Sequence, residues 1–162
     1  MLSNSRILAI YPNARGFGFA VMEGRDNLVD WGMMYVPGGN RDQAFRKVRL
    51  MLDRYRPDHL VTLHPQKSPQ RGLRVRRLLA GILDLAKEQD VPRTGLSRDQ
   101  VRRVFSEFDE TTKQVIAQTI ASRFPELQHR LPPKRKPWMS EDSRMAIFDA
   151  VALALSLQEY NV

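Results

Sequence analysis

The sequence contains no cysteine and no long apolar run, and each absence removes a class of protein. Without cysteine the chain forms neither disulfide bonds nor thiolate metal sites. No apolar run approaches the roughly 20 residues that are needed to cross a bilayer. The N-terminus also lacks the long apolar segment and the small-residue cleavage site of a signal peptide. We therefore expect no membrane association and a cytoplasmic location.

The size and composition of the chain predict a folded, basic protein. Its 162 residues predict a single domain spanning 1–162. Hydrophobic residues make up 42% of the chain, which argues against a fully disordered protein. The 26 Lys and Arg residues outnumber the 18 Asp and Glu residues, which gives a net charge of +8 and a pI near 10.3. This excess favours a polyanionic partner, although charge alone identifies none.

Residues 6–22 predict a β-hairpin on which the rest of the chain is organised. The apolar run 7–10 suits a central strand. The turn formers Pro12 and Asn13 are expected to break this strand before a second apolar run begins. Tyr11 would then lie at the end of a core strand, at the mouth of the turn.

The remaining periodicity alternates between helix and strand spacing. The predicted elements are, in order, strand 28–36, helix 42–55, strand 59–63, helix 73–87, edge strand 90–96, a helix with a capping box at Ser97 and Gln100, helix 109–123, and a last helix. That last helix is predicted to begin at an N-cap, Ser140, with Glu141 and Asp142 in its first turn. Its small and apolar residues predict close packing against a sheet.

The segment 66–77 is the first of two basic concentrations. Lys67, Arg71 and Arg74 lie in a loop and at the start of the following helix. Arginines at a helix start oppose the helix dipole, and this placement invites an anion such as a backbone phosphate. A solvated helix entry is the alternative.

The segment 128–138 is the second basic concentration. Its three prolines predict an extended loop, and Lys134, Arg135 and Lys136 precede Trp138. Cations beside an aromatic ring suit a sugar-phosphate backbone with a base or sugar packed on the ring. A tryptophan that closes the core beneath the loop is the alternative.

The first hairpin resembles that of the RuvC-type resolvases, a family of the RNase H-like superfamily. The family pattern is an apolar strand, Asp-Pro-Gly, a short basic turn and a glycine-bearing strand. The chain matches this pattern in length, in Pro12 and in Gly18. It departs at the family's metal-binding aspartate, which is replaced by Tyr11, and at the following glycine, which is Asn13.

The other family positions preserve a single acidic residue. The segment 148–155 resembles the family's closing helix, and Asp149 matches its last metal ligand. Ala146 stands one turn earlier, where the family usually has another ligand. His64, at the end of the fourth predicted strand, takes the place of the second acidic ligand, and a hydrogen-bonded structural role is its alternative. Only one of the four family ligand positions therefore keeps a carboxylate, and Tyr11 and His64 replace the acidic residue at two of the others.

The resemblance implies an α/β fold of the RNase H-like type, with a five-stranded mixed sheet in the order 3-2-1-4-5 and helices on both faces. Two-metal phosphodiester cleavage needs several carboxylates around cations roughly 4 Å apart. Because tyrosine and histidine are poor ligands for Mg²⁺, we expect the standard mechanism to fail and no cofactor to be needed. A relocated site is the alternative, built from carboxylates at Glu23, Asp26, Asp30, Glu141 and Asp142.

The resulting hypothesis is a nucleic-acid-binding domain, catalytically degenerate, that contacts structured DNA or RNA through Arg15 and the two basic segments. One alternative is a metal-dependent endonuclease of the junction-resolvase type, which would use Mg²⁺ or Mn²⁺ with substituted or relocated ligands. Another is a protein-interaction scaffold whose basic surface meets an acidic partner. Because members of the family act on branched DNA as dimers, the resemblance also implies a homodimer.

Overall fold

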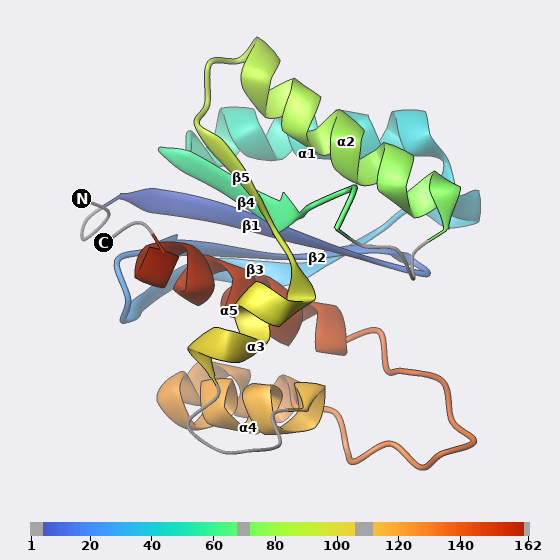
Figure 1. Ribbon diagram of the computed structural model, residues 1–162, viewed down its shortest axis with the longest axis vertical. Helices are drawn as coiled ribbons and strands as arrows, with labels where there is room; N and C mark the ends of the chain where they lie inside the picture. The colour runs from blue at the N-terminus through green and yellow to red at the C-terminus, as the bar shows by residue number, and fades with distance from the viewer. Residues whose placement is uncertain (1–4, 68–71, 106–111, 161–162) are drawn as a thin grey trace.

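The fold is built on one mixed five-stranded sheet. The computed structural model describes residues 5–67, 72–105 and 112–160. Three antiparallel strands follow one another along the chain, and two more run parallel to the first: β1 (Arg6–Asn13), β2 (Gly16–Glu23), β3 (Asn27–Tyr35), β4 (His59–Leu63) and β5 (Arg93–Leu96). The order across the sheet is β3-β2-β1-β4-β5 (Figure 1), which confirms the predicted order.

Helices cover both faces of this sheet, as predicted. On one face lie α1 (Arg41–Tyr55) and α2 (Leu73–Glu88); on the other lies α5 (Met145–Tyr160), with α3 (Arg98–Val104) and α4 (Lys113–Arg123) packed against it (Figure 1). Short 3₁₀ turns occur at Pro37–Gly39 and Pro125–Arg130. None of the helices in the described segments is long and apolar enough to span a membrane.

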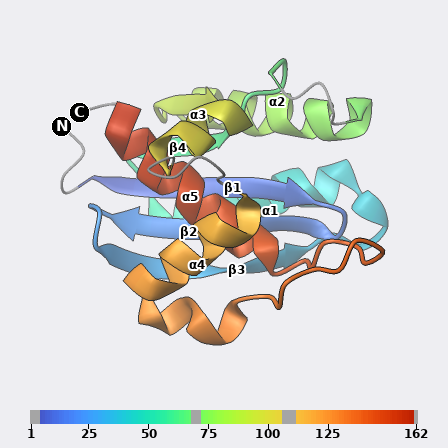
Figure 2. The same cartoon turned by 60° about the horizontal axis from the view of Figure 1, so that its bottom comes forward.

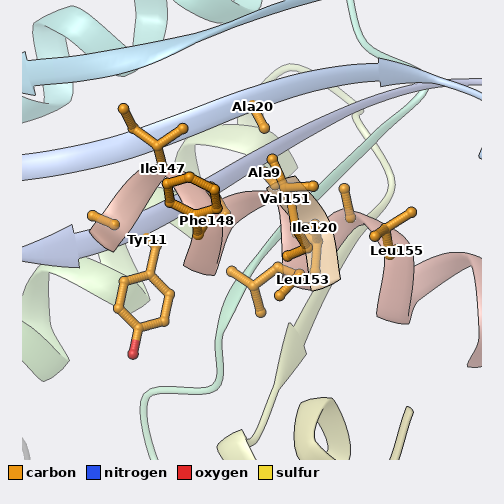
Figure 3. Packing of buried hydrophobic residues seen from close by; sticks show 14 of the residues in the cluster. Ala9, Tyr11, Ala20, Ile120, Ile147, Phe148, Val151, Leu153 and Leu155 are labelled. Carbon is orange, nitrogen blue, oxygen red and sulfur yellow. The ribbon is translucent and has the colours of Figure 1, made fainter. Parts of the chain in front are cut away.

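The helix α5 is the centre of the larger core. Because it lies between the sheet and α4, nearly all of its residues are buried, which is what a helix that is apolar all round requires. Figure 3 shows side chains of β1 and β2 facing those of α5. A Cβ atom at Gly18 would lie 2.4 Å from the backbone carbonyl carbon of Ala146. The helix therefore approaches the sheet as closely as the absence of a side chain at Gly18 allows.

The first hairpin turns later than predicted. Strand β1 continues through Pro12 to Asn13, and the turn consists of Ala14 and Arg15. The parallel pairs with β4 end at Ala9, so the missing amide of Pro12 interrupts no ladder on that side. The prediction that Pro12 breaks the strand was wrong for this reason.

The start of the last helix also differs from the prediction. The helix begins at Met145, and Ser140 does not cap it. The side chain of Asp142 accepts a hydrogen bond from the backbone N–H of Arg144, at 2.9 Å, and forms an ion pair with the Arg144 guanidinium. This local turn competes with helical hydrogen bonding, so the segment before Met145 stays irregular.

Smaller differences concern element ends. The third strand covers Asn27–Tyr35 and the edge strand begins only at Arg93. Helix α4 begins at Lys113, while residues 109–111 of the predicted helix lie outside the described segments. The first part of the predicted loop 128–138 belongs to the 3₁₀ turn Pro125–Arg130. The capping box at Ser97 and Gln100 is confirmed.

Candidate functional site

Three of the four positions that match the family's metal ligands, Tyr11, Ala146 and Asp149, lie near the carboxyl end of β1, on the face covered by α5. Tyr11 is 4% exposed and pairs with Gly18 across the hairpin. Figure 3 shows its ring at the edge of the core cluster, with the hydroxyl directed away from the other labelled side chains. Ala146 packs on Gly18 and brings no donor atom to the site. Asp149, one helical turn further along α5, brings a carboxylate that is 12% exposed.

Lys113, which is not among the predicted site residues, connects these positions. It is the first residue of α4, after an N-cap in which Thr112 Oγ1 accepts a hydrogen bond from the Val115 amide. Its Nζ lies 3.1 Å from Asp149 Oδ2 and 2.9 Å from Glu141 Oε1. The same Nζ lies 5.0 Å from the centre of the Tyr11 ring, within the range of a cation–π contact.

Burial controls the electrostatics of this cluster. It raises the pKa of Asp149 from 3.8 to about 6, and the nearby ammonium of Lys113 offsets only part of that effect. Burial by itself would lower the pKa of Lys113, but the acidic groups around the ammonium outweigh it, and the pKa rises above 10.5. At neutral pH the site therefore holds a charged ammonium beside a mostly ionised carboxylate.

The donor set that the described residues bring to the cluster does not fit a divalent metal ion. Among the described residues no cluster of three or more His, Asp or Glu side chains is placed to hold one. The ammonium of Lys113 already lies against both carboxylates of the cluster, Asp149 and Glu141. A +2 ion about 4 Å from that ammonium would be repelled by about 8 kcal/mol at an effective dielectric constant of about 20.

The space between the side chains of the cluster is small. The cavity between Tyr11, Lys113 and Asp149 has a volume of about 20 Å³, and Arg98 and Arg102 of α3 complete its wall. That volume is about enough for one water molecule. The ammonium of Lys113 and the carboxylate of Asp149 are therefore tightly packed beside the Tyr11 ring.

His64 does not join this cluster. Its neighbour Leu63 lines the cavity beside Tyr11, whereas His64 is not part of the lining. The Nδ1 atom of His64 accepts hydrogen bonds from the backbone N–H groups of Gln66 (3.1 Å) and Lys67 (3.3 Å). These contacts support the structural alternative, in which the ring organises the turn after β4.

Of the carboxylates that could form a relocated site, only Glu141 contacts Lys113, which also binds Asp149. The others are engaged elsewhere: Glu23 with Arg6, Asp26 with Arg123, Asp30 with the Tyr55 hydroxyl, and Asp142 with Arg144. A converging set of carboxylates is therefore not formed by these residues.

The first basic surface lies where the hairpin turn meets the starts of α1 and α2. Arg74 donates a hydrogen bond to the Gly38 carbonyl oxygen at 2.9 Å. It lines a cavity of about 120 Å³ together with Ala14 of the turn and Arg41 of α1. Arg41, Arg74 and Arg77 also line a neighbouring open hollow. We call this region the hairpin-end surface.

Two more of the predicted phosphate-binding residues, Arg15 and Lys67, are exposed. Arg15 belongs to the hairpin turn itself. Arg71 lies outside the described residues. Arg41 was not predicted, because it precedes the predicted helix 42–55 and only the tertiary structure brings it to Arg74.

The second basic surface is the loop 131–144, which connects the 3₁₀ turn to α5. Its basic triplet Lys134, Arg135 and Lys136 is exposed. Trp138 is 78% exposed, so it does not close the core. The loop returns to the hairpin end of the sheet (Figure 2), where the Asn13 side-chain amide donates a hydrogen bond to the Ser143 carbonyl oxygen at 3.2 Å.

Comparison with known proteins relates the chain to RuvC by structure. No protein-family model and no curated protein matches the sequence. Thermus thermophilus RuvC in complex with a Holliday junction substrate superposes with a TM-score of 0.68 and 17% identity, over 97% of this chain and 94% of that one. A second Thermus thermophilus RuvC structure gives a TM-score of 0.66 and 18% identity, over 96% and 94%.

This similarity covers almost all of both chains and confirms a RuvC-like fold of the RNase H-like class. At an identity below one fifth, it establishes the fold and not the activity.

Proposed function

We propose that this chain is a nucleic-acid-binding domain that keeps a RuvC-like fold without metal-dependent nuclease chemistry. The observation that carries the second half of the proposal is the position of Lys113. Its ammonium supplies a fixed positive charge to the carboxylates of Asp149 and Glu141, beside the Tyr11 ring. Because that charge is part of the protein, the fold needs no metal ion to stabilise these acids.

The distribution of exposed cations supports nucleic acid as the partner. Arg15, the hairpin-end surface and the loop 131–144 all lie toward the end of the sheet at which β1 and β2 turn (Figure 2). Clustered cations bind phosphates with release of counterions. The carboxyl ends of parallel strands are also the usual place for ligands in α/β sheets.

The test is binding of the purified protein to labelled single-stranded, duplex and four-way-junction DNA in Mg²⁺ and in Mn²⁺, with the products separated on a denaturing gel. The junction is included because the structurally similar RuvC is complexed with a Holliday junction. We expect salt-sensitive binding and no new bands.

Two results would contradict the proposal in different ways. Discrete cuts that disappear in Asp149→Ala would establish the metal-dependent endonuclease. An affinity for DNA that does not change with salt would instead favour a scaffold for an acidic protein, since phosphate contacts must release ions. The single-domain organisation of 1–162, the cytoplasmic location and the homodimer are further proposals that this experiment does not address.

A further inference from the structure

Trp138 is held out from the protein by a defined turn. The Met139 amide donates a hydrogen bond to the Lys136 carbonyl oxygen at 3.0 Å, which closes a β-turn with Pro137 and Trp138 at its centre. Proline is favoured at the first central position because its fixed φ suits the turn. With 78% of its surface exposed, Trp138 is the most exposed large hydrophobic residue of the described segments. The turn therefore holds the indole in an exposed position before any partner binds.

The surroundings of this ring are cationic. The ammonium of Lys136 lies 5.4 Å from the ring centre, and Lys134 and Arg135 precede it. An apolar protein partner would have to desolvate these three charges. A nucleic acid offers phosphates to the cations and a flat base to the indole, so it satisfies both features at once.

We propose that Trp138 stacks on an unpaired base, and that the ligand of this protein is therefore a nucleic acid with accessible bases rather than an uninterrupted duplex. This inference rests on the proposed nucleic-acid function and names its substrate class. Bases inside a duplex are already stacked on their neighbours and must be unstacked before a side chain can take their place. Single-stranded segments, and junctions with unpaired bases, do not carry this cost.

The expected contribution is measurable. Stacking of one base on an aromatic side chain accounts for about 5- to 150-fold in affinity when the ring is removed. Trp138→Ala should weaken binding to a single-stranded oligonucleotide by a factor in this range and weaken duplex binding much less. Trp138→Phe should retain most of the affinity, because the flat ring remains. Met139→Ala is the matched control, since Met139 is a neighbouring exposed residue with no ring.

Affinity is measured by fluorescence anisotropy of labelled oligothymidylate and of a labelled duplex. The chain has two tryptophans, so Trp31→Phe leaves Trp138 as the only one, and its emission then reports stacking directly. Oligothymidylate should quench that emission, whereas heparin, a polyanion without bases, should bind without quenching. The anisotropy series does not depend on the Trp31 substitution and stands even if that variant fails to fold.

The outcomes separate this inference from the proposed function. If the native protein binds none of the nucleic acids, both proposals fail. If it binds single strands but Trp138→Ala binds them as tightly as the native protein does, only the stacking proposal fails. A Trp138→Ala variant that changes its sedimentation but not its DNA affinity would show that the ring contacts another protein chain, and would also overturn the inference.

Discussion

Replacing Lys113 by methionine tests the ionic cluster directly. Methionine keeps much of the length and apolar character of the lysine stem but removes the ammonium. Both partners of the Lys113–Asp149 pair are largely buried, with 17% and 12% of their side chains exposed. The substitution therefore leaves a carboxylate in a poorly solvated place without its counter-charge.

Removing one partner of a buried ion pair costs about 3 to 5 kcal/mol of stability. We expect about 3 kcal/mol, the low end, because Asp149 can take up a proton near neutral pH instead of remaining an unpaired charge. Its pKa is already raised from 3.8 to about 6 with Lys113 present. Without the ammonium the pKa of Asp149 must rise further, because the charge and the hydrogen bond of Lys113 no longer lower it.

The raised pKa of Asp149 determines the direction in which stability changes with pH. A folded-state pKa above the unfolded value means that the folded protein binds more protons, so its stability falls as the pH rises through that interval. For the native protein the Asp149 contribution falls from about pH 4 to about pH 6 and is then constant. For Lys113→Met the fall should continue above pH 6, with a slope of up to about 1.4 kcal/mol per pH unit.

Urea unfolding followed by circular dichroism at pH 5, 6, 7 and 8 measures the free energy of unfolding of the native protein and of Lys113→Met. With a slope of about 2 kcal/mol per molar urea, a loss of 3 kcal/mol lowers the midpoint by about 1.5 M. The exposed Lys87→Met is the matched control and should change the stability by no more than about 0.5 kcal/mol. Adding Asp149→Asn to Lys113→Met should abolish the fall above pH 6. Equal midpoints for Lys113→Met and the native protein at pH 7 would refute the reasoning.

Three further predictions concern other parts of the molecule. Gly18→Ala should destabilise the fold by about 1–3 kcal/mol in thermal unfolding, because the added Cβ would meet the Ala146 backbone at 2.4 Å; an unchanged midpoint would show that α5 can move away. Burial and the hydrogen bond to Asp30 raise the pKa of Tyr55 from 10.0 to about 12. The stability of the native protein should therefore fall between pH 10 and 12, and that of Tyr55→Phe should fall less over the same interval. Arg74→Ala should weaken DNA binding and reduce the slope of log K against log salt by about 1, and an unchanged slope would exclude a phosphate contact there.

The strands themselves were predictable because their signals are local. Continuous apolar runs define β1 and β2, and the run that became β4 was predicted with its bounds unchanged. The match of the first hairpin and the last helix to the resolvase pattern then supplied the topology, which the structure confirms. Local signals failed where a tertiary contact competed with them. Ser97 caps a helix as predicted, whereas Ser140 does not, because the segment after it is engaged by Lys113 and Arg144.

The sequence by itself determined that three of the four family ligand positions lack a carboxylate, and that the chain is strongly basic. Only the tertiary structure decided what stands at the altered site, because Lys113 and Asp149 are 36 residues apart and meet only when α4 packs on α5. The same is true of Trp138, whose sequence context suits a core residue and an exposed one equally well. Its exposure depends on whether other elements cover the loop, and pairing and packing of distant segments cannot be read from local composition.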